Sequence, residues 1–162
     1  MSAQPGDIIL VYRGNGLFDK LIRWATTSPF FHVAMVVDGE RLIEAAFGGV
    51  RYQPVDKYDG KSVVLSPQGA TDAQRSAAVA DAQLYWRQAY GWRAIVVDAL
   101  RLGLHVPIGY RWRTWHHYDC SCLVANAWAT AGLPLTFAPA PSPADLGWSP
   151  VLIGPRPWAE PA

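Results

Sequence analysis

Two cysteines, Cys120 and Cys122, are the side chains of this sequence best suited to nucleophilic chemistry. Asp119 stands directly before them, and aspartate is one of the preferred residues at the N-cap of a helix. This pattern predicts a helix over residues 119–131, with Cys120 in its first turn. The free backbone N–H groups and the dipole at a helix start stabilise a thiolate, the form of cysteine that attacks carbonyl carbons.

The two cysteines are not equivalent on the predicted helix. The apolar residues three, four and seven positions after Cys120 share its face, which indicates that the sulfur lies at the tip of an inward-packing stripe. Cys122 is rotated from it by about 200°. A disulfide between them would be strained at this spacing. We therefore predict that Cys120 is the nucleophile.

Two other interpretations of Cys120 stay open at this point. A cysteine is often a small buried hydrophobe. The sequence also groups several metal-ligand types near it, but structural zinc usually needs two well-separated ligand pairs and only one group is present. We expect no metal and no cofactor. The residues of that group are His116, His117, Asp119, Cys120 and Cys122.

His32 and Glu44 are polar residues in two otherwise apolar segments that read as the strands of a hairpin. If residues 38–40 form a three-residue turn, residue 34 pairs with residue 44, and the two polar side chains lie on one face as diagonal neighbours. A two-residue turn would place them on opposite faces. With the longer turn, Glu44 can orient the imidazole of His32.

A thiol, an imidazole and a group that orients the imidazole form the arrangement used in nucleophilic acyl transfer. In this arrangement His32 takes the thiol proton, and Cys120 attacks a carbonyl. His32 then protonates the leaving group and activates water. The backbone N–H of Cys120 is predicted to donate to the oxyanion.

The front half of the chain is expected to build an antiparallel sheet that carries the histidine. A strand follows the Pro-Gly pair at positions 5 and 6, and a helix follows the strand. The predicted strands are 7–12, 31–37, 41–46, 50–53 and 62–65, and the helix is 17–24.

The back half is expected to be helical, with a proline-rich end. Thr71 and Gln74 have the capping-box pattern and open a helix that extends to about Gln88. Residues 92–102 are a further helix candidate. Gly132 ends the helix of Cys120. Residues 134–162 read as a belt over the domain, with one helical turn at 142–145.

The bulk composition limits the number of domains and the kinds of partner. The chain has 162 residues, 51% apolar, which is enough for one core and predicts a single domain over 1–162. A net charge of +1 gives no electrostatic reason to expect nucleic acid as a partner. The start of the chain lacks a signal-peptide pattern and no apolar run could span a bilayer, so we expect synthesis in the cytoplasm. Export by a dedicated machine or release by phage lysis stays compatible with the sequence.

The segment 111–117 mixes cations and aromatic side chains immediately before the nucleophile. Such a mixture can bind a nucleic acid strand or an anionic ligand, or can be a structural packing cluster. We prefer a rim that recognises an anionic substrate. Arg113 and Trp115 of this segment, together with Ser121 beside Cys120, are candidate substrate-binding residues.

Five segments in order give the sequence a likeness to a known family. They resemble the circularly permuted papain-like hydrolases of the NlpC/P60 superfamily, the group of YiiX-like and YaeF-like proteins, in which the histidine strand precedes the cysteine helix. The five segments are Pro5–Leu10, Ser28–Val33, Leu42–Ala45, Cys120–Val124 with Ala131 and Gly132, and Ser142–Leu146.

The resemblance implies an α+β fold, with an antiparallel sheet packed against the nucleophile helix and further helices. It implies the roles given above for Cys120, His32 and Glu44, and it adds Tyr90 as a tyrosine near the cleft. The predicted function is a cysteine-dependent hydrolase of amide bonds, with peptide or peptidoglycan fragments as substrates. A lipid esterase or acyltransferase and a catalytically inactive binding module are the alternatives.

Overall fold

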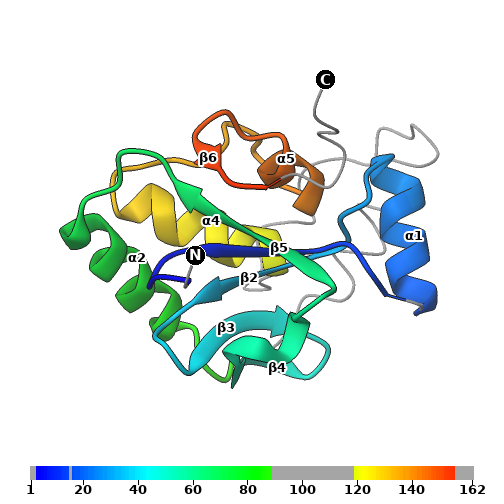
Figure 1. The fold of residues 1–162 in the computed structure, drawn as a ribbon, viewed down its shortest axis with the longest axis horizontal. Coiled ribbons are helices and arrows are strands. Elements are labelled where there is room, and N and C mark those ends of the chain that lie inside the picture. The colour runs from blue at the N-terminus through cyan, green and yellow to red at the C-terminus, as the bar shows by residue number, and fades with distance from the viewer. Residues whose placement is uncertain (1–2, 15, 89–118, 156–162) are drawn as a thin grey trace.

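The computed structural model describes residues 3–14, 16–88 and 119–155. Its order of elements begins with a strand and a helix and continues through a hairpin, as the sequence predicts (Figure 1). The elements are β1 (Ile8–Val11), α1 (Leu17–Thr26), β2 (His32–Val36), β3 (Arg41–Ala46), β4 (Gly49–Pro54), the 3₁₀ helix η1 (Val55–Tyr58), β5 (Ser62–Pro67), α2 (Asp72–Leu84), α4 (Cys120–Thr130), α5 (Pro143–Gly147) and β6 (Leu152–Ile153).

The strands form one antiparallel sheet in the order β4-β3-β2-β1-β5-β6. In β2 and β3, Met35 pairs with Ile43 and Val36 with Leu42. This is the register that a three-residue turn at 38–40 predicts. The carboxylate of Asp38 stabilises that turn because it accepts hydrogen bonds from the backbone N–H groups of Glu40 and Arg41.

One face of the sheet packs against α4, and α2 packs against α4 in turn (Figure 1). The alternation of strand side chains places Val33, Met35 and Ile43 in this core, where they are fully buried. Leu123 and Val124 of α4 are also fully buried there. The helix that begins with Cys120 is therefore fixed to the sheet that carries His32.

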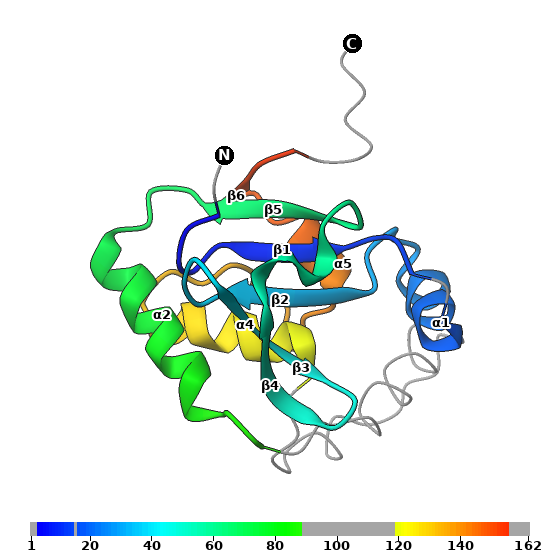
Figure 2. The ribbon, with the colours of Figure 1, turned by 60° about the horizontal axis from the view of Figure 1, so that its bottom comes forward.

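The opposite face of the sheet is covered by the chain that follows β4. Ala34, Val36 and Leu42 are buried on this face and pack against Val55 and Tyr58 of η1. Figure 2 shows η1 and β4 in front of β1 and β2 in that view. Polar side chains of η1 therefore also lie on this face of the sheet.

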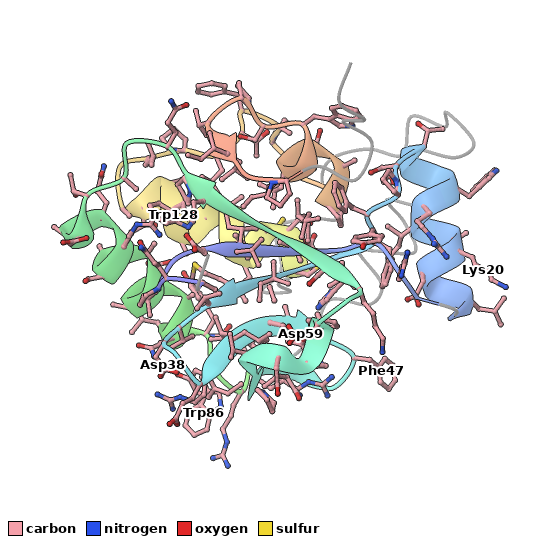
Figure 3. The ribbon with its side chains drawn as sticks, viewed as in Figure 1. Lys20, Asp38, Phe47, Asp59, Trp86 and Trp128 are labelled. Atoms are coloured by element: carbon pink, nitrogen blue, oxygen red, sulfur yellow. The ribbon has the colours of Figure 1, made fainter. Side chains whose placement is uncertain are left out.

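The amino-terminal strand is tied to α2 and α4 by polar contacts. The buried carboxylate of Asp7 accepts hydrogen bonds from Arg75 at 2.8 Å and from Ser66 at 2.6 Å. Trp128, labelled in Figure 3, donates its indole N–H to the carbonyl of Gly6 at 3.2 Å. These bonds satisfy groups that would be costly to bury alone.

The helix predicted from the capping box is shorter than expected. Thr71 and Gln74 do cap α2, but the helix ends at Leu84 and does not reach Gln88. Arg87 takes a left-handed backbone conformation at φ 69°, and the backbones of Arg87 and Gln88 bond to Val50 of β4. Pairing with the sheet therefore replaces the last predicted turn.

The carboxyl-terminal part contains the predicted turn of helix and one strand that the sequence pattern does not predict. Ser142 caps α5 by accepting from the N–H of Asp145, and Pro143 occupies the first turn. β6 then pairs with β5. The helix candidate at 92–102 lies outside the described residues.

Within the described ranges, no helix has the length and apolar character needed to cross a membrane.

Leu123→Ala tests the packing that places α4 on the sheet. Leu123 is fully buried, so the change should lower the free energy of unfolding by about 2–5 kcal/mol, measured by urea denaturation. Leu84→Ala is the matched control, because this leucine of α2 is 74% exposed and should change stability by less than about 0.5 kcal/mol. Equal losses in the two variants would contradict the packing described.

Candidate active site

Cys120 is the first residue of α4, and Asp119 is its N-cap. The carboxylate of Asp119 accepts a hydrogen bond from the N–H of Cys122 at 2.7 Å. The first N–H groups of a helix have no partner within it and point out of its start. The backbone N–H groups of Cys120 and Ser121 are therefore placed to receive negative charge.

The two cysteines differ in exposure as the helix pattern predicts. Cys120 is 4% exposed and belongs to the core, whereas Cys122 is half-buried. Ser121 is also buried, and its hydroxyl oxygen lies 3.9 Å from the sulfur of Cys120. The serine proposed from the sequence as a substrate contact is thus a neighbour of the sulfur.

His32 opens β2, and its Nε2 lies 3.0 Å from Oε2 of Glu44 on β3. The hairpin register places the two side chains on the same face, as expected. Cys120 also acts on the imidazole, because its interaction with the ring contributes to the raised pKa of His32. Glu44 is thus hydrogen-bonded to His32, and Cys120 lies near enough to the imidazole to influence its pKa.

The position of His32 at the end of a strand explains how it reaches both partners. Val33 and Met35 face α4, so the alternation places His32 on the other face, with Glu44. As the first residue of β2, it lies at the end of the sheet. From there the ring bonds to the carboxylate of Glu44 and is near enough to Cys120, at the start of α4, for the cysteine to influence its pKa.

The pKa of His32 is set by opposing effects. Burial opposes protonation and by itself lowers the pKa of the imidazole. The hydrogen bond and charge of Cys120, followed by those of Glu44, act in the other direction and are stronger. Together they raise the pKa of His32 from 6.5 to about 9. The imidazole of His32 is therefore expected to carry a proton at neutral pH.

Glu44 has three further partners that the sequence did not identify. Its Oε1 accepts hydrogen bonds from Lys57 Nζ at 2.5 Å and from Arg51 Nε at 3.2 Å. Its Oε2 accepts from the hydroxyl of Tyr58 at 2.5 Å. Glu44 is completely buried, so these donors satisfy a charge that would otherwise be very costly to bury.

The same contacts keep Glu44 ionised. Burial favours the neutral acid, but the hydrogen bond and charge of His32, with the bonds of Lys57 and Tyr58, hold the pKa of Glu44 far below its usual range. Burial and the bond to Glu44 raise the pKa of Tyr58 well above its usual value. The phenol is therefore a permanent donor and the carboxylate a permanent acceptor.

The sequence holds a signal for only one of these partners. A two-residue turn between Ala46 and Gly49 fixes a register in which Glu44 pairs with Arg51, and the structure has this pair. Lys57 and Tyr58 follow Pro54 in a short 3₁₀ helix whose path over the sheet depends on tertiary packing. No local pattern indicates where their side chains point.

The remaining predictions cannot be placed. Tyr90, Arg113 and Trp115 lie outside the described residues, as do His116 and His117, two members of the group of metal-ligand types from which we expect no metal site. Among the described residues, no group of three or more histidine, cysteine or acidic side chains has an arrangement that could hold a metal ion.

Comparison with solved structures finds a protein with the same fold. The chain superposes on the crystal structure of the metalloprotein YiiX from Escherichia coli O157:H7 with a TM-score of 0.72. The match covers 96% of this chain and 98% of YiiX, at 19% sequence identity. The chain has the fold of YiiX. The resemblance to YiiX-like proteins that the five sequence segments indicate is therefore confirmed for the fold.

The likeness to YiiX lies in structure rather than in closely similar sequence. No protein-family model matches the chain, and no curated protein matches it in sequence. The observed architecture is α+β, with an antiparallel sheet and helices packed against it. The fold alone does not choose a reaction.

Glu44→Gln tests the buried charge. The variant should lower the free energy of unfolding at pH 7 by about 3–5 kcal/mol, because it leaves the cations around position 44 without their counter-charge. The folded-state pKa of Glu44 is depressed, so its contribution is present above the unfolded value of 4.5 and is lost as the pH falls below it. The gap between wild type and variant should narrow from pH 5 to pH 3 in urea denaturation. A gap that stays constant over this range would show that the charge contributes nothing.

Proposed function

We propose that this chain is a cysteine-dependent hydrolase of amide bonds in which Cys120 is the nucleophile, His32 the base and Glu44 the residue that orients the base. The observation that carries the proposal is the hydrogen bond between Glu44 and His32, together with a cysteine at a capped helix start that helps to raise the pKa of His32. A nucleophile, a base and a residue that orients the base are the groups that acyl transfer uses.

The first half-reaction forms an acyl-enzyme. The thiolate of Cys120 attacks the carbonyl carbon of the substrate, and the oxygen of that carbonyl becomes an oxyanion. The N–H groups of Cys120 and Ser121 at the start of α4 donate to it. The imidazolium of His32 gives its proton to the leaving amine as the carbon–nitrogen bond breaks, which leaves a thioester on Cys120.

The second half-reaction releases the acid. Neutral His32 accepts a proton from a water molecule, and the hydroxide attacks the thioester. The carbon–sulfur bond breaks, and the thiolate and imidazolium pair forms again. Glu44 stays ionised throughout and stabilises the imidazolium in each step in which it forms.

The order of the catalytic residues supports a permuted papain-like arrangement. The histidine strand β2 and the orienting residue on β3 both precede the cysteine helix α4. In unpermuted relatives of the family that the sequence resembles, the cysteine helix comes first. The same catalytic residues would then be brought together by a circularly permuted chain.

Peptides with the chemistry of cell-wall fragments are the substrates that the resemblance favours. The family that the sequence resembles acts on cell-wall peptide amides or on lipid esters and amides. A peptide carrying a free carboxylate would suit a rim with the cations and aromatic residues of segment 111–117. We therefore propose peptidoglycan-derived peptides as the first substrates to test.

YiiX is described as a metalloprotein, which raises the question of a metal at this site. Both oxygens of Glu44 already accept hydrogen bonds, and two of the donors, Lys57 and Arg51, are cations. A divalent cation at this carboxylate would have to replace these two donors and would be repelled by their positive charges. The described residues around Glu44 therefore do not fit a metal centre, and the proposed mechanism uses none.

Hydrolysis of peptidoglycan stem peptides, followed by mass spectrometry of the products, tests the proposal. Wild type should cleave an amide bond, and Cys120→Ser should lower the rate by at least about a thousandfold. Cys122→Ser is the matched control and should retain near-wild-type activity, because this residue lies on another face of α4.

The outcomes separate the nucleophile from the substrate. Cleavage of a phospholipid or acyl ester, with peptides untouched, would replace the substrate class but keep Cys120 as nucleophile. Activity that survives Cys120→Ser would contradict the proposal itself.

A further inference from the structure

The 3₁₀ helix η1 places two consecutive side chains on the carboxylate of Glu44. Lys57 donates to Oε1 and Tyr58 donates to Oε2, each at 2.5 Å. A carboxylate with a donor fixed on each oxygen cannot rotate without breaking one of two short bonds, at least one of which is charge-assisted. The direction in which Glu44 presents Oε2 is therefore set by η1.

Tyr58 contacts both members of the pair formed by His32 and Glu44. Its hydroxyl shares Oε2 with the Nε2 of His32. Its ring lies against the imidazole, with 5.7 Å between ring centroids and an angle of 57° between the planes. The tyrosine thus limits the orientation of the imidazole as well as that of the carboxylate.

Lys57 is the stronger of the two cations on Oε1. Its ammonium lies closer than the guanidinium of Arg51, at 2.5 Å against 3.2 Å. The side chain of Lys57 is 28% exposed and that of Arg51 is 45% exposed, so water screens the arginine more. Lys57 also lies 4.8 Å above the ring of Tyr58, which keeps the two η1 side chains together.

We propose that η1 tunes the candidate active site, in which Lys57 and Tyr58 fix the orientation of the Glu44 carboxylate and compete with the imidazolium of His32 for it. The proposal rests on the proposed function for the role of His32. Neither η1 residue touches the reacting atoms, so both are positioning residues. Among the residues that the structure describes, the charged and titratable groups around the carboxylate are His32 of β2, Arg51 of β4, Lys57 and Tyr58 of η1, and, beyond the imidazole, Cys120 of α4.

Competition for the carboxylate predicts the direction in which the pKa of His32 changes when a competitor is removed. A cation or an O–H group on Glu44 weakens the pull of the carboxylate on the proton of His32. Removing Lys57 or the hydroxyl of Tyr58 should therefore raise the pKa of His32. Removing the carboxylate should lower it. A residue that served only to stabilise the fold would not shift the titration in this pattern.

Proton NMR titration of the His32 ring from pH 5 to pH 11 measures this directly, with the resonance assigned by its loss in His32→Ala. Wild type should titrate at about 9. The midpoint should rise by about half a pH unit or more in Lys57→Met and by less in Tyr58→Phe. It should fall by about one unit or more in Glu44→Gln.

Matched variants separate charge from general disturbance. Lys57→Arg keeps the cation and should restore the wild-type midpoint. Lys61→Met removes an exposed lysine near η1, and Tyr52→Phe removes a phenol from another part of the sheet, so both should titrate as wild type. Tyr58→Phe retains the aromatic ring. It tests the proposal on its own if Lys57→Met fails to fold, as judged by circular dichroism.

The proposal is overturned if Tyr58→Phe and the folded Lys57 variants titrate within about 0.2 units of wild type, or if their midpoints fall. This result is independent of the proposed function, because the titration needs no substrate. Shifts of the expected sign in a protein that cleaves no amide bond would keep the role of η1 and reject the hydrolase.

Discussion

The completely buried carboxylate of Glu44 is the constraint on which the candidate site depends. The free energy of burying an isolated charge at this position would exceed the stability of a typical domain. Both oxygens of the carboxylate therefore need hydrogen-bond donors. The donors come from β2, β4 and η1, which are separate parts of the chain. The hairpin register and the path of η1 are therefore coupled to the ionisation of one side chain.

The second requirement is a fixed distance between that carboxylate and the start of α4. The apolar stripe of α4 packs on one face of the sheet, while Glu44 lies on the other. His32 links them because it is the first residue of β2 and lies where the sheet ends. A histidine in the middle of the strand would reach only one of the two partners.

The parts of this arrangement that were predictable from sequence depend on local physics. The N-cap at Asp119 and the turn at 38–40 are set by neighbouring residues, and they give the place of Cys120 and the register of Glu44. The early end of α2, the pairing of β6 and the contacts of η1 depend on segments far away in the chain. Lys57 and Tyr58 were missed for that reason. Arg51 was missed as well, although the short turn before β4 could have indicated its pairing with Glu44.

The central claim is that His32 maintains Cys120 as a thiolate. Alkylation with iodoacetamide from pH 5 to pH 9, with mass mapping of the modified cysteine, tests it most directly in wild type and His32→Ala. Cys120 should react in preference to Cys122 below pH 7, and His32→Ala should abolish this reactivity at acid pH. Faster reaction of Cys122, or equal profiles in the two proteins, would contradict it.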